Sequence, residues 1–182
     1  MPPRFLFLRM AILSPDLSTH RQLSLHYHEF DTPDQLSAPE RRVWDAARAA
    51  TAHSYAPYSH FHVGAALLLA DDTVFQGTNQ ENAAYPSGLC AERTALFGLA
   101  GSHLGAVPRI VGMAVAGRPA QGDFTAALPC GACRQVMLES EMRQGQPVWL
   151  LLPGPTGTVL RFERLADLLP FHFSPSDLPP RL

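Results

Sequence analysis

The apolar positions of the chain first become periodic after residue 36. Four apolar residues then repeat at helical spacing, namely Val43, Trp44, Ala47 and Ala50. The segment Ser37-Ala-Pro-Glu40 that precedes them has the form of a capping box with a proline in the first turn. Together the two signals predict a helix that runs from residue 38 to about residue 53.

Apolar runs bounded by turn residues predict the other elements. Strands are expected over residues 63–70, 74–77, 109–117, 147–152 and 158–162. Helices are expected over residues 90–100 and 129–142, with a short last helix over 165–169. A hairpin followed by strand-helix-strand units predicts an α/β fold, with helices on both faces of a mixed sheet of about five strands in three layers, α/β/α.

Residues 1–36 lack sustained periodicity, so an irregular N-terminal extension is expected ahead of a single domain over residues 37–182. The opening MPPRFLFLRMAIL is too short to span a membrane and lacks a clear small-residue cleavage site. Neither a signal peptide nor a transmembrane helix is therefore expected, and Met10 is a second candidate start. No partnership with a membrane is predicted.

The charge composition excludes several kinds of chemistry. The formal net charge is -2, so no broad basic face is available to neutralise the phosphates of a nucleic acid. All 14 basic residues other than histidine are arginines. A Schiff-base lysine and a phosphate-loop lysine are therefore both absent.

The chain has three cysteines, an odd number, and two of them form Cys130-Gly-Ala-Cys133. A disulfide framework of a small secreted domain does not fit this count, so metal or redox chemistry in the cytoplasm is expected. Cys90 and Cys130 both fall where a predicted helix begins, and helix N-termini favour the thiolate form that binds zinc. Three ligands with one open position are typical of a catalytic zinc site.

A closed structural site or a redox Cys-x-x-Cys pair is the alternative interpretation of these cysteines. A fourth ligand for a closed site could come from a histidine, with His60, His62 and His103 as candidates. Glu92 favours the catalytic interpretation, because a carboxylate two residues after a ligand has no purpose in a closed site.

Four segments of the chain resemble the cytidine deaminase family: YAPYSHFHVGAAL, GTNQENAAYPSGLCAERTAL, PCGACRQVMLE and LLPFHF. The resemblance implies the three-layer fold of that family and a catalytic domain over residues 37–182. It implies one Zn²⁺ per subunit, held by Cys90, Cys130 and Cys133, and hydrolysis of cytidine and deoxycytidine to the uridines and ammonia. Glu92 would move protons between the attacking water and the base.

The same resemblance assigns residues to substrate recognition. Asn79 and Glu81 match the pair that binds the ribose hydroxyls, and Phe61 matches the aromatic residue that packs against the pyrimidine. The backbone of Ala91 matches a contact to the edge of the base. Gln80 is more polar than the family pattern leads us to expect.

The resemblance also implies a homotetramer whose subunits share their active sites. Tyr85 and Phe173 match positions that approach the active site of a neighbouring subunit. Arg93 matches a residue that hydrogen-bonds the ligand sulfurs and offsets the negative charge of three thiolates around one divalent ion.

Three other functions remain open from the sequence. A deaminase of another aminated pyrimidine nucleoside, such as blasticidin S, would share the zinc motifs. A polynucleotide editor would use the same zinc chemistry but would need a basic groove and stacking residues. A noncatalytic zinc-binding module would need neither Glu92 nor an open coordination position.

Overall fold

Helix α1 begins where its capping box predicts. The backbone N–H of Ser37 donates to Oε2 of Glu40 at 2.9 Å, and α1 then spans Ala38–Ala50. Its buried face consists of the four apolar residues of the sequence pattern. A 3₁₀ turn over Thr51–His53 continues from the helix, which explains why the pattern extended to residue 53.

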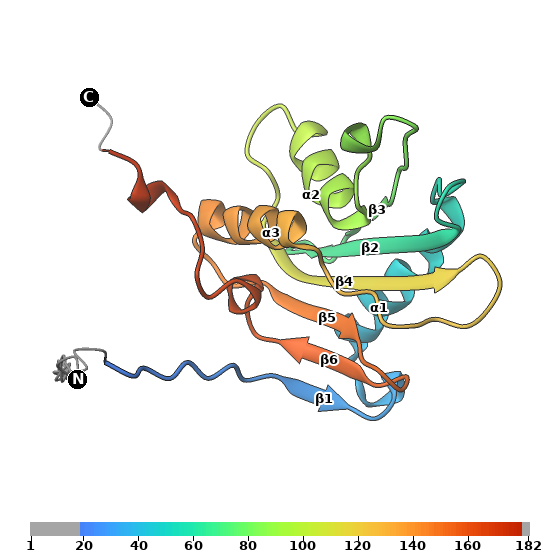
Figure 1. The fold of residues 1–182 in the computed structure, drawn as a ribbon, viewed down its shortest axis with the longest axis horizontal. Coiled ribbons are helices and arrows are strands. Elements are labelled where there is room, and N and C mark those ends of the chain that lie inside the picture. The colour runs from blue at the N-terminus through green and yellow to red at the C-terminus, as the bar shows by residue number, and fades with distance from the viewer. Residues whose placement is uncertain (1–18, 180–182) are drawn as a thin grey trace, which may run out of the picture.

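The computed structural model describes residues 19–179 and centres on a six-stranded mixed sheet of order β1-β6-β5-β4-β2-β3 (Figure 1). Its strands are β1 His28–Phe30, β2 Phe61–Leu69, β3 Val74–Thr78, β4 Ile110–Pro119, β5 Trp149–Pro153 and β6 Val159–Phe162. The other two helices are α2 Ala91–Gly101 and α3 Gly131–Gln144. Only β4 and β5 pair in parallel, and the other neighbours are antiparallel.

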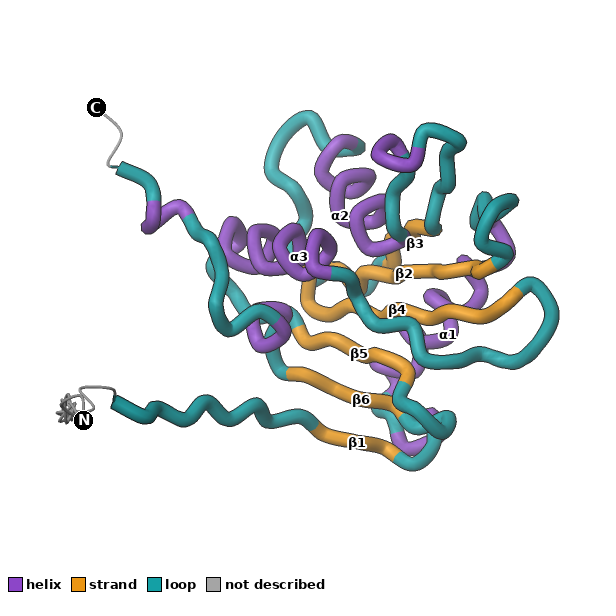
Figure 2. Tube along the Cα trace, in the orientation of Figure 1, coloured by secondary structure: helices purple, strands orange, loops and turns teal. Residues whose placement is uncertain are grey.

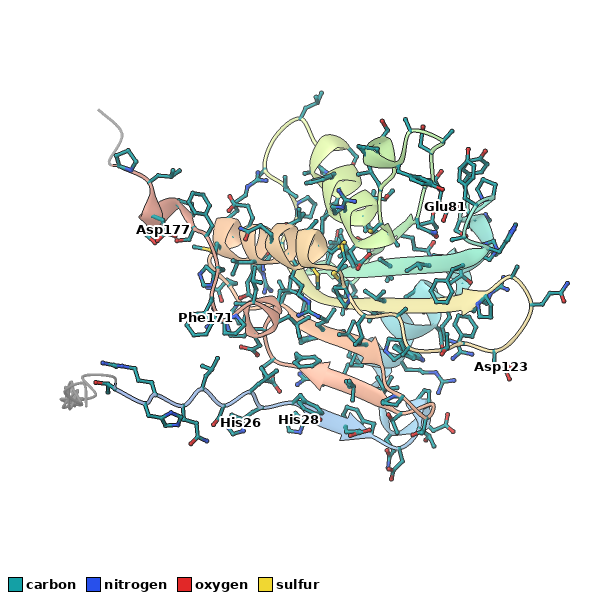
Figure 3. All side chains as sticks on the ribbon, in the orientation of Figure 1. His26, His28, Glu81, Asp123, Phe171 and Asp177 are labelled. Atoms are coloured by element: carbon teal, nitrogen blue, oxygen red, sulfur yellow. The ribbon has the colours of Figure 1, made fainter. Side chains whose placement is uncertain are left out.

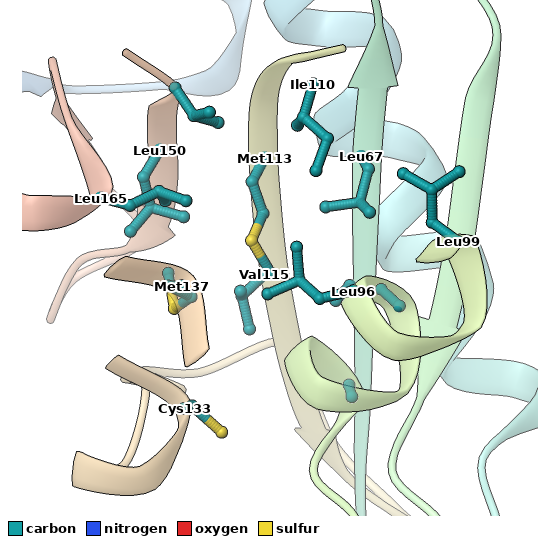
Figure 4. Packing of buried hydrophobic residues seen from close by; sticks show 14 of the residues in the cluster. Leu67, Leu96, Leu99, Ile110, Met113, Val115, Cys133, Met137, Leu150 and Leu165 are labelled. Carbon is teal, nitrogen blue, oxygen red and sulfur yellow. The ribbon is translucent and has the colours of Figure 1, made fainter. Parts of the chain in front are cut away.

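Helices cover both faces of this sheet, so the predicted three-layer α/β/α arrangement is confirmed. Helix α1 lies on one face, and α2 and α3 lie together on the other (Figures 1 and 2). Strand β2 serves both cores, because Ala65 and Leu67 point to the α2/α3 side while Ala66 and Leu68 point to α1. Figure 4 shows the core under α2 and α3, where a side chain such as Leu67 is fully buried and contributes about 1.5–3 kcal/mol.

The sheet has one strand more than the sequence pattern predicts, because β1 lies in the segment expected to be irregular. Phe30 of β1 pairs with Val159 of β6, and the centres of the Tyr27 and Phe162 rings are 5.4 Å apart. The strand is only three residues long and Phe30 alone is partly buried, so it has little hydrophobic periodicity. The prediction of about five strands was therefore low by one.

The C-terminal part differs slightly from the expectation of a last α-helix. Residues 165–168 form a 3₁₀ helix, and a second 3₁₀ turn follows at Pro175–Asp177. Within residues 19–179, no helix has the length and apolarity needed to cross a membrane. The opening segment, for which neither a signal peptide nor a membrane span was expected, lies outside the described residues.

Candidate active site

The three cysteines meet at the N-terminal ends of α2 and α3. Cys90 is the N-cap residue of α2, Cys130 is the N-cap residue of α3, and Cys133 lies in the first turn of α3. The Sγ atoms of Cys90 and Cys130 are 3.9 Å apart, and those of Cys130 and Cys133 are 3.4 Å apart. All three sulfurs lie within 4.8 Å of one another.

This arrangement fits a zinc ion. Tetrahedral zinc with Zn–S bonds of about 2.3 Å separates its sulfur ligands by about 3.8 Å, close to the two distances observed. No histidine in the described part of the chain belongs to the cluster. Two of the candidate fourth ligands have other neighbours, since His62 Nδ1 lies 2.6 Å from Ser54 Oγ and His103 Nδ1 lies 2.9 Å from the Leu99 carbonyl. The described residues therefore offer three thiols, which would leave one of the four positions of a tetrahedral zinc ion for another ligand.

The surroundings of the sulfurs favour a thiolate. A hydrogen bond from Cys133, helped by the nearby guanidinium of Arg93, lowers the pKa of Cys90 to about 5 although burial opposes this shift. The same interaction with Cys90, together with burial, raises the pKa of Cys133. Nη2 of Arg93 lies 3.8 Å from Cys90 Sγ and also donates to the carbonyl of Gly88 at 3.4 Å. A bound metal would displace the protons that the sulfurs share.

Glu92 is the buried acid of the site. It occupies the first turn of α2, and only 4% of its surface is exposed. Burial raises the pKa of its carboxyl group, and the neighbouring Cys90 adds to this shift. Both effects favour the protonated form of this carboxyl group relative to an exposed glutamate, and a positioned carboxyl group can exchange a proton with a bound molecule.

Cys90, Cys130 and Glu92 border a pocket with a volume of ≈ 630 Å³. Its walls come from β2 and the segment before it, the segment after β3, the start of α2, β4 and the segment before α3. The lining residues are Tyr58, Ser59, Phe61, Val63, Asn79, Gln80, Glu81, Asn82, Tyr85, Gly88, Leu89, Cys90, Ala91, Glu92, Arg93, Val115, Ala127, Leu128 and Cys130. The volume lies in the range of pockets that bury small organic ligands.

Asn79 and Glu81 line this pocket and also hold its loops together. Oδ1 of Asn79 accepts from the Val63 N–H at 2.8 Å, and its Nδ2 donates to the Phe61 carbonyl at 2.9 Å. Oε2 of Glu81, labelled in Figure 3, accepts from the backbone N–H groups of Tyr58 and Ser59 at 2.9 and 3.2 Å. Hydrogen bonds from Ser59 hold the pKa of Glu81 below its usual value.

The structure brings most of the other predicted residues to the pocket, with one exception. Phe61, Ala91 and Tyr85 line it, and 76% of Tyr85 is exposed. Phe173 does not line it. This residue lies on the C-terminal segment, is 60% exposed, and its carbonyl accepts from Nε2 of Gln135 at 2.9 Å.

Sequence reasoning missed several residues of the pocket. Ala127 and Leu128 line it from the segment before Pro129, and the backbone of Tyr58 and Ser59 fixes Glu81. Tyr58 and Ser59 belong to the segment YAPYSHFHVGAAL that resembles the family, but neither was assigned a role in the pocket. Their position two to three residues before Phe61, which was expected to pack against the pyrimidine, was the available signal.

Comparisons with known proteins agree with this site. Residues 39–146 match the sequence model of the "Cytidine and deoxycytidylate deaminase zinc-binding region". The cytidine deaminase of Mycobacterium tuberculosis (strain ATCC 25618 / H37Rv) is 39% identical over 136 residues, which cover 73% of this chain and 88% of that protein. The crystal structure of cytidine deaminase from Burkholderia pseudomallei is similar with a TM-score of 0.59 and 42% identity, over 72% of this chain and 97% of that one. A match to more than half of the chain, together with a relative of this similarity, shows that the chain belongs to the cytidine deaminase family.

Proposed function

We propose that this enzyme deaminates cytidine and deoxycytidine by hydrolysis at a zinc ion held by Cys90, Cys130 and Cys133, with Glu92 as the proton carrier. One observation carries the proposal. Three sulfurs that lie within 4.8 Å of one another and a buried carboxyl group meet beside one pocket of ≈ 630 Å³, whose lining includes Cys90, Cys130 and Glu92. A noncatalytic zinc module would not require the carboxyl group or the pocket.

Each residue of the centre has a chemical task. Zinc, when bound, activates a water molecule for attack on the substrate at neutral pH. Glu92 accepts a proton from the attacking water and delivers it to N3 of the pyrimidine; it then takes the second proton of that oxygen and passes it to the departing amine. Its place in the pocket lining, two residues after Cys90, suits this task because a positioned carboxyl group can pass protons to atoms within hydrogen-bond reach. Arg93 offsets the negative charge that three thiolates leave on the centre.

The nucleoside would be held by the rest of the pocket. Phe61 and Ala91 both line the pocket. The Phe61 ring would pack against the pyrimidine, and the Ala91 backbone would contact the edge of the base. The two backbone amides use only Oε2 of Glu81, so Oε1 keeps acceptor capacity for a ribose hydroxyl. Asn79 similarly retains one N–H and one lone pair beyond its bonds to β2.

We also infer that the enzyme is a cytoplasmic homotetramer with shared active sites. Phe173 and Tyr85 are aromatic and largely exposed in a single chain, which fits burial against another subunit. Free thiols as ligands suit the reducing cytoplasm. Sedimentation of the wild type and of Phe173→Ala tests this inference. A wild-type monomer with full activity would contradict it.

The fall in ultraviolet absorbance as cytidine becomes uridine tests the catalytic proposal. Wild type, Glu92→Gln and a control variant, Glu139→Gln on α3, are compared, with zinc measured in each. Turnover by the wild type and the control alone, at equal zinc content, is expected. Full activity of Glu92→Gln would contradict the role of Glu92. A wild type that holds zinc but leaves cytidine intact would redirect the search to another aminated pyrimidine.

A further inference from the structure

The loop over residues 120–128 joins β4 to Pro129 and the metal-binding turn of α3. In Figure 1 it extends beyond the end of β4 and returns along the sheet towards α3, and Figure 3 labels Asp123 in its outer part. Ala127 and Leu128, at its end, line the nucleoside pocket. Contacts that fix the position of this loop therefore also fix the position of one wall of the pocket.

The loop is fixed from the α1 side of the sheet. The guanidinium carbon of Arg48 on α1 lies 3.9 Å from the centre of the Phe124 ring, a cation–π contact. Phe124 also packs against the core under α1. Arg118, at the end of β4, donates to the hydroxyl of Thr51 at 3.2 Å. The contacts of Phe124 therefore hold the middle of the loop on the α1 side of the sheet.

The loop is also fixed from the pocket side. The N–H of Ala120 donates to the carbonyl of His60 at 2.8 Å, directly before Phe61. The N–H of Thr125 donates to the carbonyl of Gly117 at 3.0 Å. The loop and the Phe61 segment are therefore attached to each other and to the same stretch of β4.

The end of loop 120–128, the Phe61 ring and strand β4 meet at Gly117. A Cβ at this position would lie 2.5 Å from Cβ of Ala127 and 2.9 Å from Cε1 of Phe61, where ordinary contacts are 3.4–4 Å. Residue 117 points to the same face of β4 as Val115, which lines the pocket. The missing side chain thus lets the Phe61 ring and the end of the loop close over β4.

We propose that Gly117 is a positioning residue for substrate binding: it allows loop 120–128 and the Phe61 ring to pack together as a fixed wall of the nucleoside pocket. This inference rests on the proposed function, because Phe61 is taken as the residue that contacts the pyrimidine. A methyl group at 117 must displace Ala127 or Phe61 by roughly 1 Å, and shifts of that size at a binding site are costly.

The test uses full-length, zinc-loaded enzyme and the steady-state kinetics of cytidine turnover. Gly117→Ala is expected to raise KM about tenfold, with a smaller change in kcat and with zinc content unchanged. The double variant Gly117→Ala/Ala127→Gly removes the shorter clash and is expected to return KM to within about threefold of wild type. A wild-type KM in Gly117→Ala would overturn the proposal.

Gly112→Ala is the matched control on the same strand. A Cβ at residue 112 would meet the Trp149 ring at 2.1 Å, but on the α1 face and away from the pocket. It is expected to lower thermal stability and leave KM unchanged. An equal rise of KM in both glycine variants would mean general destabilisation and would refute a positioning role.

Arg48→Ala provides a second variant that adds no atoms, in case Gly117→Ala does not fold. Loss of the contact to Phe124 is expected to raise KM severalfold at unchanged zinc content. An unchanged KM in Arg48→Ala would show that the attachment of loop 120–128 does not affect substrate binding, and would overturn the proposal. A wild type without activity on cytidine would instead refute the proposed function, so the two failures are distinguishable.

Discussion

Glu141 is a buried carboxylate whose removal should reveal how α3 is fixed to the rest of the domain. Its Oε2 accepts from the N–H of Val148 at 3.0 Å and from the N–H of Leu165 at 2.8 Å. Both donors belong to residues with 0% exposure, and only 3% of Glu141 itself is exposed. Its Oε1 lies 3.3 Å from the guanidinium of Arg164, whose side chain is 58% exposed and adds little.

The expected cost of Glu141→Ala follows from these contacts. It would leave two buried N–H groups without acceptors, at about 1–3 kcal/mol each, so the free energy of unfolding should fall by about 2–6 kcal/mol. Glu141→Gln keeps an oxygen for both donors and should cost less. Urea unfolding at fixed protein and zinc concentrations measures the difference.

Glu139→Ala is the control, because it removes a carboxylate from the same helix without any hydrogen bond among the described residues being lost. Its effect should stay within about 0.5 kcal/mol. A Glu141→Ala variant that loses less than about 1 kcal/mol, or no more than this control, would refute the reasoning. Such a result would mean that water accepts the hydrogen bonds of the Val148 and Leu165 N–H groups once the carboxylate is removed.

Three further predictions concern charge. Arg93→Gln should lower kcat about tenfold or more while zinc content, measured by atomic absorption, stays the same, because the centre then keeps its negative charge. Glu81→Gln should raise KM for cytidine. Thermal stability should stay nearly unchanged, since the amide oxygen of the new side chain still accepts from the backbone N–H groups of residues 58 and 59. An unchanged KM would argue against a contact between Glu81 and the ribose. Burial would raise the pKa of Glu40, but hydrogen bonds from Ser37 and Arg161 outweigh it and hold the pKa below 4.5. The stability difference between wild type and Glu40→Gln, from urea unfolding, should therefore be complete at neutral pH and shrink below about pH 4.5; a constant difference would contradict this.

Features fixed by neighbours in the sequence were predictable. The start of α1 depends on a capping box within four residues, and its buried face follows from helical spacing. The cysteine cluster was predictable because Cys90 and Cys130 each directly precede a helix. Since the two helices lie side by side on one face of the sheet, their N-termini bring the sulfurs together.

Features that depend on distant contacts were not predictable in the same way. Strand β1 exists because β6 offers a free edge, and its own three residues carry almost no pattern. The bonds of Glu81 to the loop at residues 58–59 join segments more than 20 residues apart. The reason for a glycine at 117 appears only when Ala127 and Phe61 are placed over it.

Zinc K-edge X-ray absorption of the purified enzyme tests the central claim most directly, because it counts the atoms around the metal. Three sulfur ligands at about 2.3 Å and one lighter ligand are expected in the wild type, and two sulfurs after Cys133→Ser. Four protein ligands with a histidine among them, or a spectrum unchanged by Cys133→Ser, would contradict a three-cysteine centre with an open position.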